Sequence, residues 1–284
     1  MAGSGVLSHV GWRLAPFRGL VEPMPSRRAR SAALVALGVR LASRGTLAVT
    51  GLVLTALVGA GAAIAAILSG AARVAFLPAL SSSAIAWGGG VTLAFGAALR
   101  ALRSDRDLGL LALVLARGAT LGEYVRGRVL GLVAVLAMAV GGATLVACAS
   151  AIAVAHGSGA VVRSSAGALV YALVFSATLG PVAMAALGAR TRAGGYLSLM
   201  GVLVVPELLA GFTRHLLPRG WRELTSLPEA LAAVRTGIEH PVLQGAHAAR
   251  ALVGLAAVIA VALLVIAGRV QARPADGEPW PGAR

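Results

Sequence analysis

The sequence predicts an all-α integral membrane protein, and two observations point to that class. Hydrophobic residues make up 58% of the 284 residues and charged residues only 12%, with a mean hydropathy of +0.86. A soluble domain carries roughly 25% charged residues. The apolar residues also gather into runs of roughly 20, the length that a helix needs to cross a bilayer. Most of the chain is therefore expected to face lipid or other helices.

Six apolar runs have the length and composition of membrane spans. They are expected at 46–69, 75–99, 127–155, 165–189, 195–213 and 250–268. The third run is longer than a membrane requires, which predicts a helix that is tilted or that projects beyond the bilayer. Together the runs predict a six-helix transmembrane domain over 46–269.

The segment before the first span, 1–45, is expected to be a cytoplasmic tail that leads into an amphipathic interfacial helix at about 31–44. Arg40 and Arg44 would stay in water while the apolar side chains enter the headgroup boundary. These apolar side chains are Leu34, Val35, Leu37, Val39 and Leu41.

The distribution of arginine predicts the orientation. With the amino terminus inside, 18 arginines lie on the cytoplasmic side and 7 on the outer side, which favours two cytoplasmic termini. The 100–128 loop is then cytoplasmic and the 214–249 loop extracytoplasmic. Within the outer loop, 228–238 is expected to form a short helix that either lies on the membrane face or folds back towards the spans. The Pro/Gly-rich tail, 270–284, is expected to be disordered and cytoplasmic.

The charge distribution and the motifs missing from the sequence argue against several function classes. The net charge of +15 comes from arginines in loops, so contacts with anionic membrane lipid explain it better than nucleic acid does. Without any lysine there is no phosphate-binding G-x-x-x-x-G-K motif. The five histidines are scattered, and Cys148 stands alone in an apolar run. No catalytic set, metal site or cofactor site is therefore expected in this chain.

The loop at 100–128 is the most informative segment. It holds six arginines and three acids, and within it the apolar residues of 108–115 recur at helical spacing on one face. An amphipathic helix in a charged cytoplasmic loop indicates docking onto another protein. The alternative is an ordinary connecting loop whose arginines only set the topology.

This loop and the start of the third span resemble the corresponding region of type 2 ABC transporter permeases. In that family an acidic residue and a glycine open a short cytoplasmic coupling helix, and a Gly-Lys-like pair leads into the third span. Asp107 and Gly109 match the opening, and Gly127-Arg128 matches the pair.

Two positions depart from the family pattern: Leu110 stands where a threonine is usual, and Ala112 where a second acid is common. The interfacial helix, six spans, cytoplasmic termini and helical outer loop extend the resemblance over almost the whole chain. The 192–212 segment also resembles the haem-exporter B-type permeases of the same superfamily.

The resemblance implies a permease subunit of an ATP-binding cassette transporter in the cytoplasmic (inner) membrane of a bacterium. Export is favoured because the loop signature of importers is not found. A separate ATPase subunit would bind ATP and dock on the coupling helix at 104–118, and a second permease subunit, identical or different, would complete the pore. This chain would then not be an enzyme itself.

The resemblance and the loop pattern together place the docking contacts. Charged side chains would make charge-assisted contacts with the ATPase while leucines fill a groove on it. The candidate docking residues are Asp105, Arg106, Asp107, Leu108, Gly109, Leu111 and Leu115.

Glu207 is the most prominent charged residue inside a predicted span. A carboxylate in a span is costly and often functional. It lies towards the outer end, with Arg214 seven residues on and on the same helical face. It is expected either to pair with that arginine near the interface, or to line a substrate path, or to bend the helix with Pro206.

Two other functions remain open from the sequence. One is a stand-alone secondary transporter or channel, which would need charged or unwound sites near the membrane midplane. The other is a membrane scaffold or assembly protein that transports nothing.

Overall fold

The computed structural model describes residues 26–70, 74–98, 113–114, 119–187, 192–213 and 226–271. Its helices, with short 3₁₀ and π segments labelled η, are α1 (Arg27–Ala42), α2 (Thr46–Ser69), η1 (Val74–Phe76), α3 (Leu77–Ala84), η2 (Ile85–Gly90), α4 (Val91–Ala98), α7 (Leu121–Leu136), η3 (Ala137–Gly141), α8 (Gly142–Val154), α9 (Gly159–Leu187), α10 (Arg192–Thr213), α12 (Leu227–Glu239) and α13 (Pro241–Gln271). The described residues contain no β-strand. This confirms the all-α class.

Five helical stretches are long and apolar enough to cross a membrane, as expected for a multi-pass membrane protein. They are Thr46–Ser69, Val74–Ala98, Leu121–Val154, Gly159–Ala186 and Pro241–Gly268. Each overlaps one of the predicted spans. The remaining predicted span falls on α10, whose apolar part, Gly194–Leu209, is shorter. The count of six spans therefore stays a prediction.

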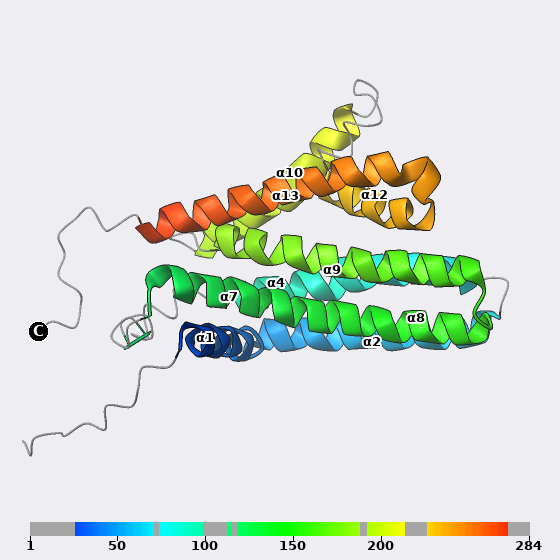
Figure 1. Cartoon of the computed structure of the whole chain (residues 1–284), viewed down its shortest axis with the longest axis horizontal. Coiled ribbons are helices and arrows are strands. Elements are labelled where there is room, and N and C mark those ends of the chain that lie inside the picture. The colour runs from blue at the N-terminus through cyan, green and yellow to red at the C-terminus, as the bar shows by residue number, and fades with distance from the viewer. Residues whose placement is uncertain are drawn as a thin grey trace, which may run out of the picture.

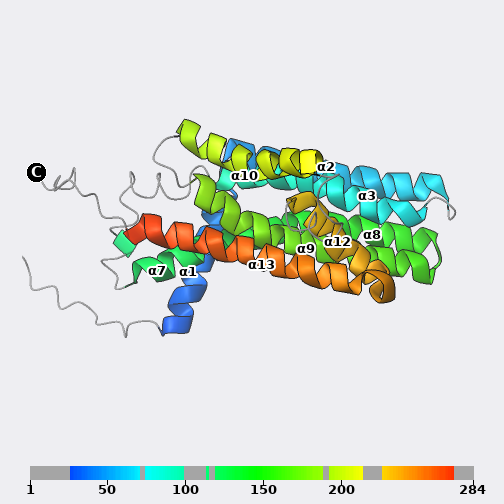
Figure 2. The same cartoon turned by 90° about the horizontal axis from the view of Figure 1, so that it is seen from above.

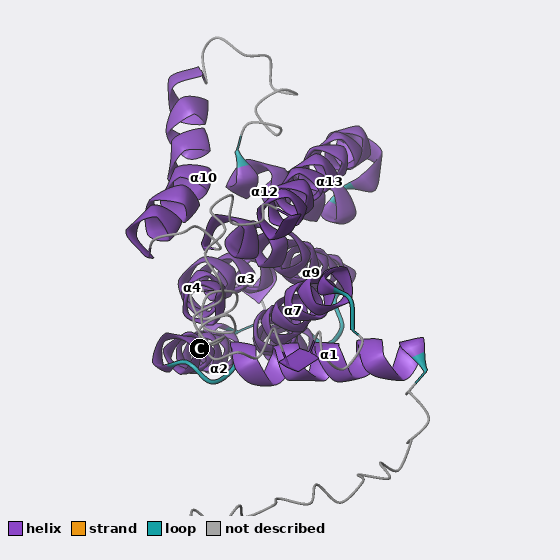
Figure 3. Cartoon of the chain, turned by 90° about the vertical axis from the view of Figure 1, so that its left-hand side faces the viewer, coloured by secondary structure: helices purple, strands orange, loops and turns teal. Residues whose placement is uncertain are grey.

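The long helices run side by side, and α1 lies across one end of them (Figures 1, 2 and 3). We call this end the α1 end; it also holds the start of α7 and the last turns of α13. The other end, which we call the turn end, holds the α8–α9 turn at 155–158. Gly157 in that turn has a φ of 73°, a backbone conformation that glycine adopts without strain.

The central element is α9. In the apolar 18-residue stretch of α9, 72% of the residues are buried, compared with 22% in the corresponding stretches of α2 and α13. It contacts α3, α4, α7, α8, α10, α12 and α13. The exposed faces of α2 and α13 are rich in leucine and valine, as expected of helices that face lipid.

The third long stretch begins at Leu121 rather than near 127. Thr120 caps it: the Thr120 hydroxyl accepts from the Glu123 amide at 3.2 Å, and the Thr120 amide donates to Glu123 Oε2 at 3.1 Å. This capping box satisfies two amides that would otherwise lack partners at the helix start. Residues 121–128, predicted as part of the cytoplasmic loop, are therefore the first two turns of α7.

The helix predicted at 31–44 is α1, which begins four residues earlier than expected. Its inner face packs on α7 through glycines rather than pointing wholly towards lipid. A Cβ on Gly131 would lie 2.6 Å from Gly38 Cα, and one on Gly127 would lie 2.7 Å from Leu34 Cβ. We call this contact, made by Leu34, Gly38, Gly127 and Gly131, the glycine seam. Arg40 is exposed, as predicted.

The outer-loop helix is α12, which agrees closely with the predicted 228–238. Ser226 caps it by accepting from the Glu229 amide at 3.3 Å, and Pro228 stands in its first turn. It folds back into the bundle and packs on α9 and α13 (Figure 1), which settles the alternative left open by the sequence.

The last span also begins earlier than predicted, because α13 starts at Pro241 instead of 250. Proline is favoured in the first turn of a helix, where its missing N–H costs no hydrogen bond. Gly237 lets α12 and α13 approach closely at the start of this hairpin, since an added Cβ would overlap Ala248 Cβ. Residues 241–249, expected in the outer loop, are thus helical.

Candidate functional site

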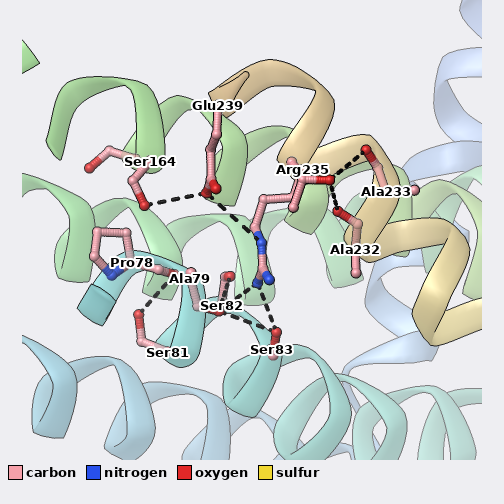
Figure 4. Close-up of polar contacts among 12 residues, drawn as sticks. Pro78, Ala79, Ser81, Ser82, Ser83, Ser164, Ala232, Ala233, Arg235 and Glu239 are labelled. Carbon is pink, nitrogen blue, oxygen red and sulfur yellow. Dashed lines mark hydrogen bonds and ion pairs between the residues drawn. The ribbon is translucent and has the colours of Figure 1, made fainter. Parts of the chain in front are cut away.

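A partly buried polar network lies under α12, between the turn end and the middle of the bundle (Figures 1 and 4). Its centre is Arg235, whose side chain is 18% exposed. Arg235 Nη1 donates to the Ala79 carbonyl at 2.9 Å and to Ser83 Oγ at 3.2 Å, so that one guanidinium joins α12 to α3. The Ala79 and Arg235 contact spans 156 positions of sequence.

The carboxylate of Glu239, one turn further along α12, forms an ion pair with the Arg235 guanidinium. Its Oε1 lies 3.9 Å from Arg235 Nε, an ion pair at (i, i+4) spacing, and accepts a hydrogen bond from Ser164 Oγ at 3.4 Å. Ser164 belongs to α9, so the network ties three helices together (Figure 4). Gly167 of α9 leaves room for it, because a Cβ there would lie 3.1 Å from Arg235 Cγ.

An aromatic cluster continues the network towards the middle of the bundle. The Arg235 guanidinium carbon lies 5.7 Å from the centroid of the Tyr171 ring, within cation–π range. Trp87 Nε1 donates to the Tyr171 hydroxyl at 2.8 Å. Phe175 stacks on Tyr171 at 6.4 Å and meets Trp87 edge-on at 5.5 Å.

Two π segments meet at this cluster. Trp87 belongs to η2, and η2 packs against η3 of the neighbouring span. A Cβ on Gly90 of η2 would lie 2.8 Å from Phe175 Cε1 and 2.9 Å from Val140 Cγ2 of η3. Single-turn π segments are rare and frequently occur at functional sites. Two that pack together beside a buried arginine mark this region as the candidate functional site.

The network of Arg235, Glu239, Ser83 and Ser164 can hold α12 against α3 and α9, and we call it the latch. A buried charge in an apolar surrounding is costly unless it is paired and hydrogen-bonded. Moving α12 away from α3 and α9 would break the hydrogen bonds of Arg235 to Ala79 and Ser83 and that of Glu239 to Ser164, whereas the ion pair within α12 would remain. The hydrogen bonds between helices therefore favour the packed position of α12.

Sequence reasoning missed this site. Arg235 was placed only among the outer arginines, and Glu239 was not singled out. The sequence does contain one indication of this site: Arg235 and Glu239 lie four residues apart on a helix whose other face is apolar. Fold-back of α12, which gives Arg235 its partners on α3, cannot be seen from that spacing.

Glu207, the predicted intramembrane acid, lies on α10 away from this network. Its Oε2 accepts a hydrogen bond from the hydroxyl of Ser226, the residue that caps α12. The predicted partner, Arg214, lies outside the described residues. Glu207 itself is exposed, whereas Ser226 is 2% exposed, so the contact connects α10 to the start of α12.

The candidate docking residues lie outside the described residues. They are Asp105, Arg106, Asp107, Leu108, Gly109, Leu111 and Leu115. Of the predicted 104–118 coupling helix, 113–114 is described and is helical.

Among the residues that the structure describes, no group of three or more His, Cys, Asp or Glu side chains is placed to hold a metal ion. Cys148 is buried, with its Sγ 3.7 Å from the Ser165 carbonyl. Comparison with protein-family models and with curated protein sequences gave no match to this chain.

Proposed function

We propose that this chain is the membrane-spanning permease subunit of an ATP-binding cassette transporter, an exporter of the type 2 class, in the inner membrane of a bacterium. A separate ATPase subunit binds ATP and docks on the 104–118 segment. Two permease subunits face each other to complete the pathway. The proposal starts from the resemblance of the 100–131 segment to the coupling region of that class.

The observation that carries the proposal is the glycine seam at the α1 end. The charged segment leads directly into the Thr120 cap and α7, and α7 is held against α1 by backbone-to-backbone contact at Gly38 and Gly131. A load applied to the segment would therefore reach α1 and α7 as one unit. This is the mechanical connection that a permease driven by an external ATPase requires.

The latch under α12 supports the same mechanism. A transporter needs an element that closes one end of the bundle and releases it during the cycle. The α12 helix packs on α9 and α13 through a buried apolar face, and a small number of polar contacts to α3 and α9 fix its position. A rocking motion of the spans can break and remake these polar contacts.

The proposal is tested by association with the ATPase. The chain is co-expressed with an ATP-binding cassette protein encoded beside it, purified, and assayed for bound ATPase. We expect the double variant Asp107→Lys with Leu111→Lys to lose the ATPase. A matched control, Ser158→Lys with Ala160→Lys at the turn end, keeps it. Retention of the ATPase by the first variant refutes the docking assignment, and the absence of any associated ATPase favours a stand-alone transporter or a scaffold.

Orientation provides a second, independent test. In a Cys148→Ala background, single cysteines are introduced by Asp107→Cys and Ser158→Cys, and intact cells are treated with an impermeant maleimide. We expect labelling at position 158 in intact cells and at position 107 only after permeabilisation. The reverse pattern places the segment outside, where no ATPase can reach it, and refutes the proposal.

A further inference from the structure

Two hollows lie next to each other at the α1 end. The first, of about 590 Å³, lies between α1 and α7 and is lined by Arg28, Ser31 and Glu123 among others. The second, of about 780 Å³, lies along α7, α9 and α13. Both are lined by Arg126 and Leu130, which therefore lie between the two hollows. Each volume is in the range of small-molecule sites.

The first hollow has charged side chains in its wall, although most of its lining surface is apolar. Arg28 of α1 and Arg126 of α7 are both exposed, so their guanidinium groups are open to an incoming anion. The carboxylate in its wall belongs to Glu123, which accepts a hydrogen bond from the Thr120 amide at 3.1 Å as part of the capping box. Two arginines against one acid leave the hollow with a net positive charge, which favours an anionic group such as a phosphate.

The second hollow is apolar. Its walls are Val129 and Val133 on α7 and Ile259, Leu263 and Ile266 on α13. Because α9 packs against both α7 and α13, it forms the floor of a groove between them. From Arg126 to Val133 the groove follows α7 for about 10 Å, at 1.5 Å per residue, into the apolar part of the bundle.

We propose that these two adjacent hollows together bind one anionic phospholipid from the leaflet at the α1 end. The phosphate lies between Arg28 and Arg126, and one acyl chain occupies the groove between α7 and α13. A charged hollow beside an apolar one matches a molecule with an anionic head and a hydrocarbon tail. Arg126 and Leu130 of α7 line both hollows, so the two parts are neighbours, and α1 lies across this end of the long helices (Figure 2). The inference does not depend on the proposed transport function.

The test uses the full-length protein in phosphatidylcholine nanodiscs that contain a small fraction of phosphatidylglycerol with a photoreactive group on one acyl chain. After irradiation, adducts are mapped by mass spectrometry, and unlabelled phosphatidylglycerol or phosphatidylcholine is added as a competitor. We expect adducts within 121–133 and 259–267, removed by the anionic competitor and not by the zwitterionic one.

Matched variants separate the two halves of the site. Arg28→Gln with Arg126→Gln should lower the yield of adduct by about 30-fold, the order expected for two arginines near a membrane surface. Arg40→Gln with Arg44→Gln removes the same charge outside both hollows and should leave the yield unchanged. Leu263→Trp fills the groove and should abolish adducts on α13, whereas Leu264→Trp, on a side chain that is 71% exposed and outside the groove, should not.

Three results would overturn the proposal. Equal competition by phosphatidylcholine means that the site takes any lipid. An equal loss of adduct in the Arg40 and Arg44 variant means that bulk surface charge, not this hollow, recruits the lipid. Adducts only at residues that line neither hollow mean that the lipid binds elsewhere on the protein, whereas adducts at Ala177 or Pro181, on the floor of the groove, agree with the proposal.

Discussion

Replacing Gly131 by alanine should destabilise the protein through the contact between α1 and α7. A Cβ at Gly131 would lie 2.6 Å from the Cα and from the carbonyl carbon of Gly38, and 2.7 Å from the Val39 amide nitrogen. Unstrained carbon contacts lie at about 3.5–4.0 Å. All three neighbours are backbone atoms, so no side chain can turn away and α1 must move by about 1 Å.

The size of the effect follows from two opposing terms. Overpacking of this kind costs about 1–3 kcal/mol. Alanine is favoured over glycine inside a helix by up to about 1 kcal/mol. We therefore expect Gly131→Ala to lower the free energy of unfolding by about 1–2 kcal/mol, measured by equilibrium unfolding in mixed detergent micelles. Faster hydrogen exchange in α1 should accompany it, because α1 loses its packing.

The matched control is Gly142→Ala, at the start of α8. No atom lies within 4 Å of a Cβ added there, so only the helix-propensity term remains and the variant should be unchanged or more stable by up to about 1 kcal/mol. If Gly131→Ala is as stable as Gly142→Ala, then α1 is not held by close backbone contact. The mechanical argument based on the glycine seam would then fail.

Three further substitutions probe the network and the helix start by the same unfolding measurement. Arg235→Ala should lower the free energy of unfolding by about 2–4 kcal/mol, because it removes charge-assisted hydrogen bonds and leaves the partly buried Glu239 without its ion-pair partner. The control, Arg250→Ala on the exposed face of α13, should change it by no more than about 0.5 kcal/mol. Equal costs for the two variants would refute the latch. Thr120→Ala should cost about 1 kcal/mol and speed amide exchange in the first turn of α7, and unchanged exchange would show that the capping box is not formed. Trp87→Phe should cost about 1 kcal/mol, and a Tyr171→Phe background should abolish that cost if the hydrogen bond between them is its source.

The spans were predictable because hydropathy and run length act locally. The first predicted span, 46–69, coincides with α2, and the outer-loop helix was expected within one residue of each end of α12. Helix starts were predicted less well. The Thr120 capping box was visible in the sequence, but the predicted start followed the apolar run instead of the cap. Pro241 likewise starts α13 among residues that are not strongly apolar.

The candidate site could not be predicted to the same extent, because its contacts depend on tertiary packing. The Arg235 contact with Ala79 exists only because α12 folds back, a choice that the sequence left open. Glu207 shows the same limit: fold-back of α12 brings Ser226 to it, a contact that helical spacing does not indicate, while the predicted pairing with Arg214 stays a prediction because Arg214 lies outside the described residues. Periodicity identifies which residues share a face, but it does not identify what that face meets.

The described contacts form an unbroken path from the glycine seam to the latch. Gly131 lies on α7, which continues through η3; η3 packs on η2; and Trp87 of η2 bonds to Tyr171 beneath Arg235. Proximity alone does not establish energetic coupling, which requires that each end bias the other. The two ends are coupled if Gly131→Ala and Arg235→Ala together change the unfolding free energy by an amount that differs from the sum of the single effects by more than about 0.5 kcal/mol. Strict additivity would mean that the α1 end and the latch respond independently, and a load on the charged segment would then have no route through these contacts to α12.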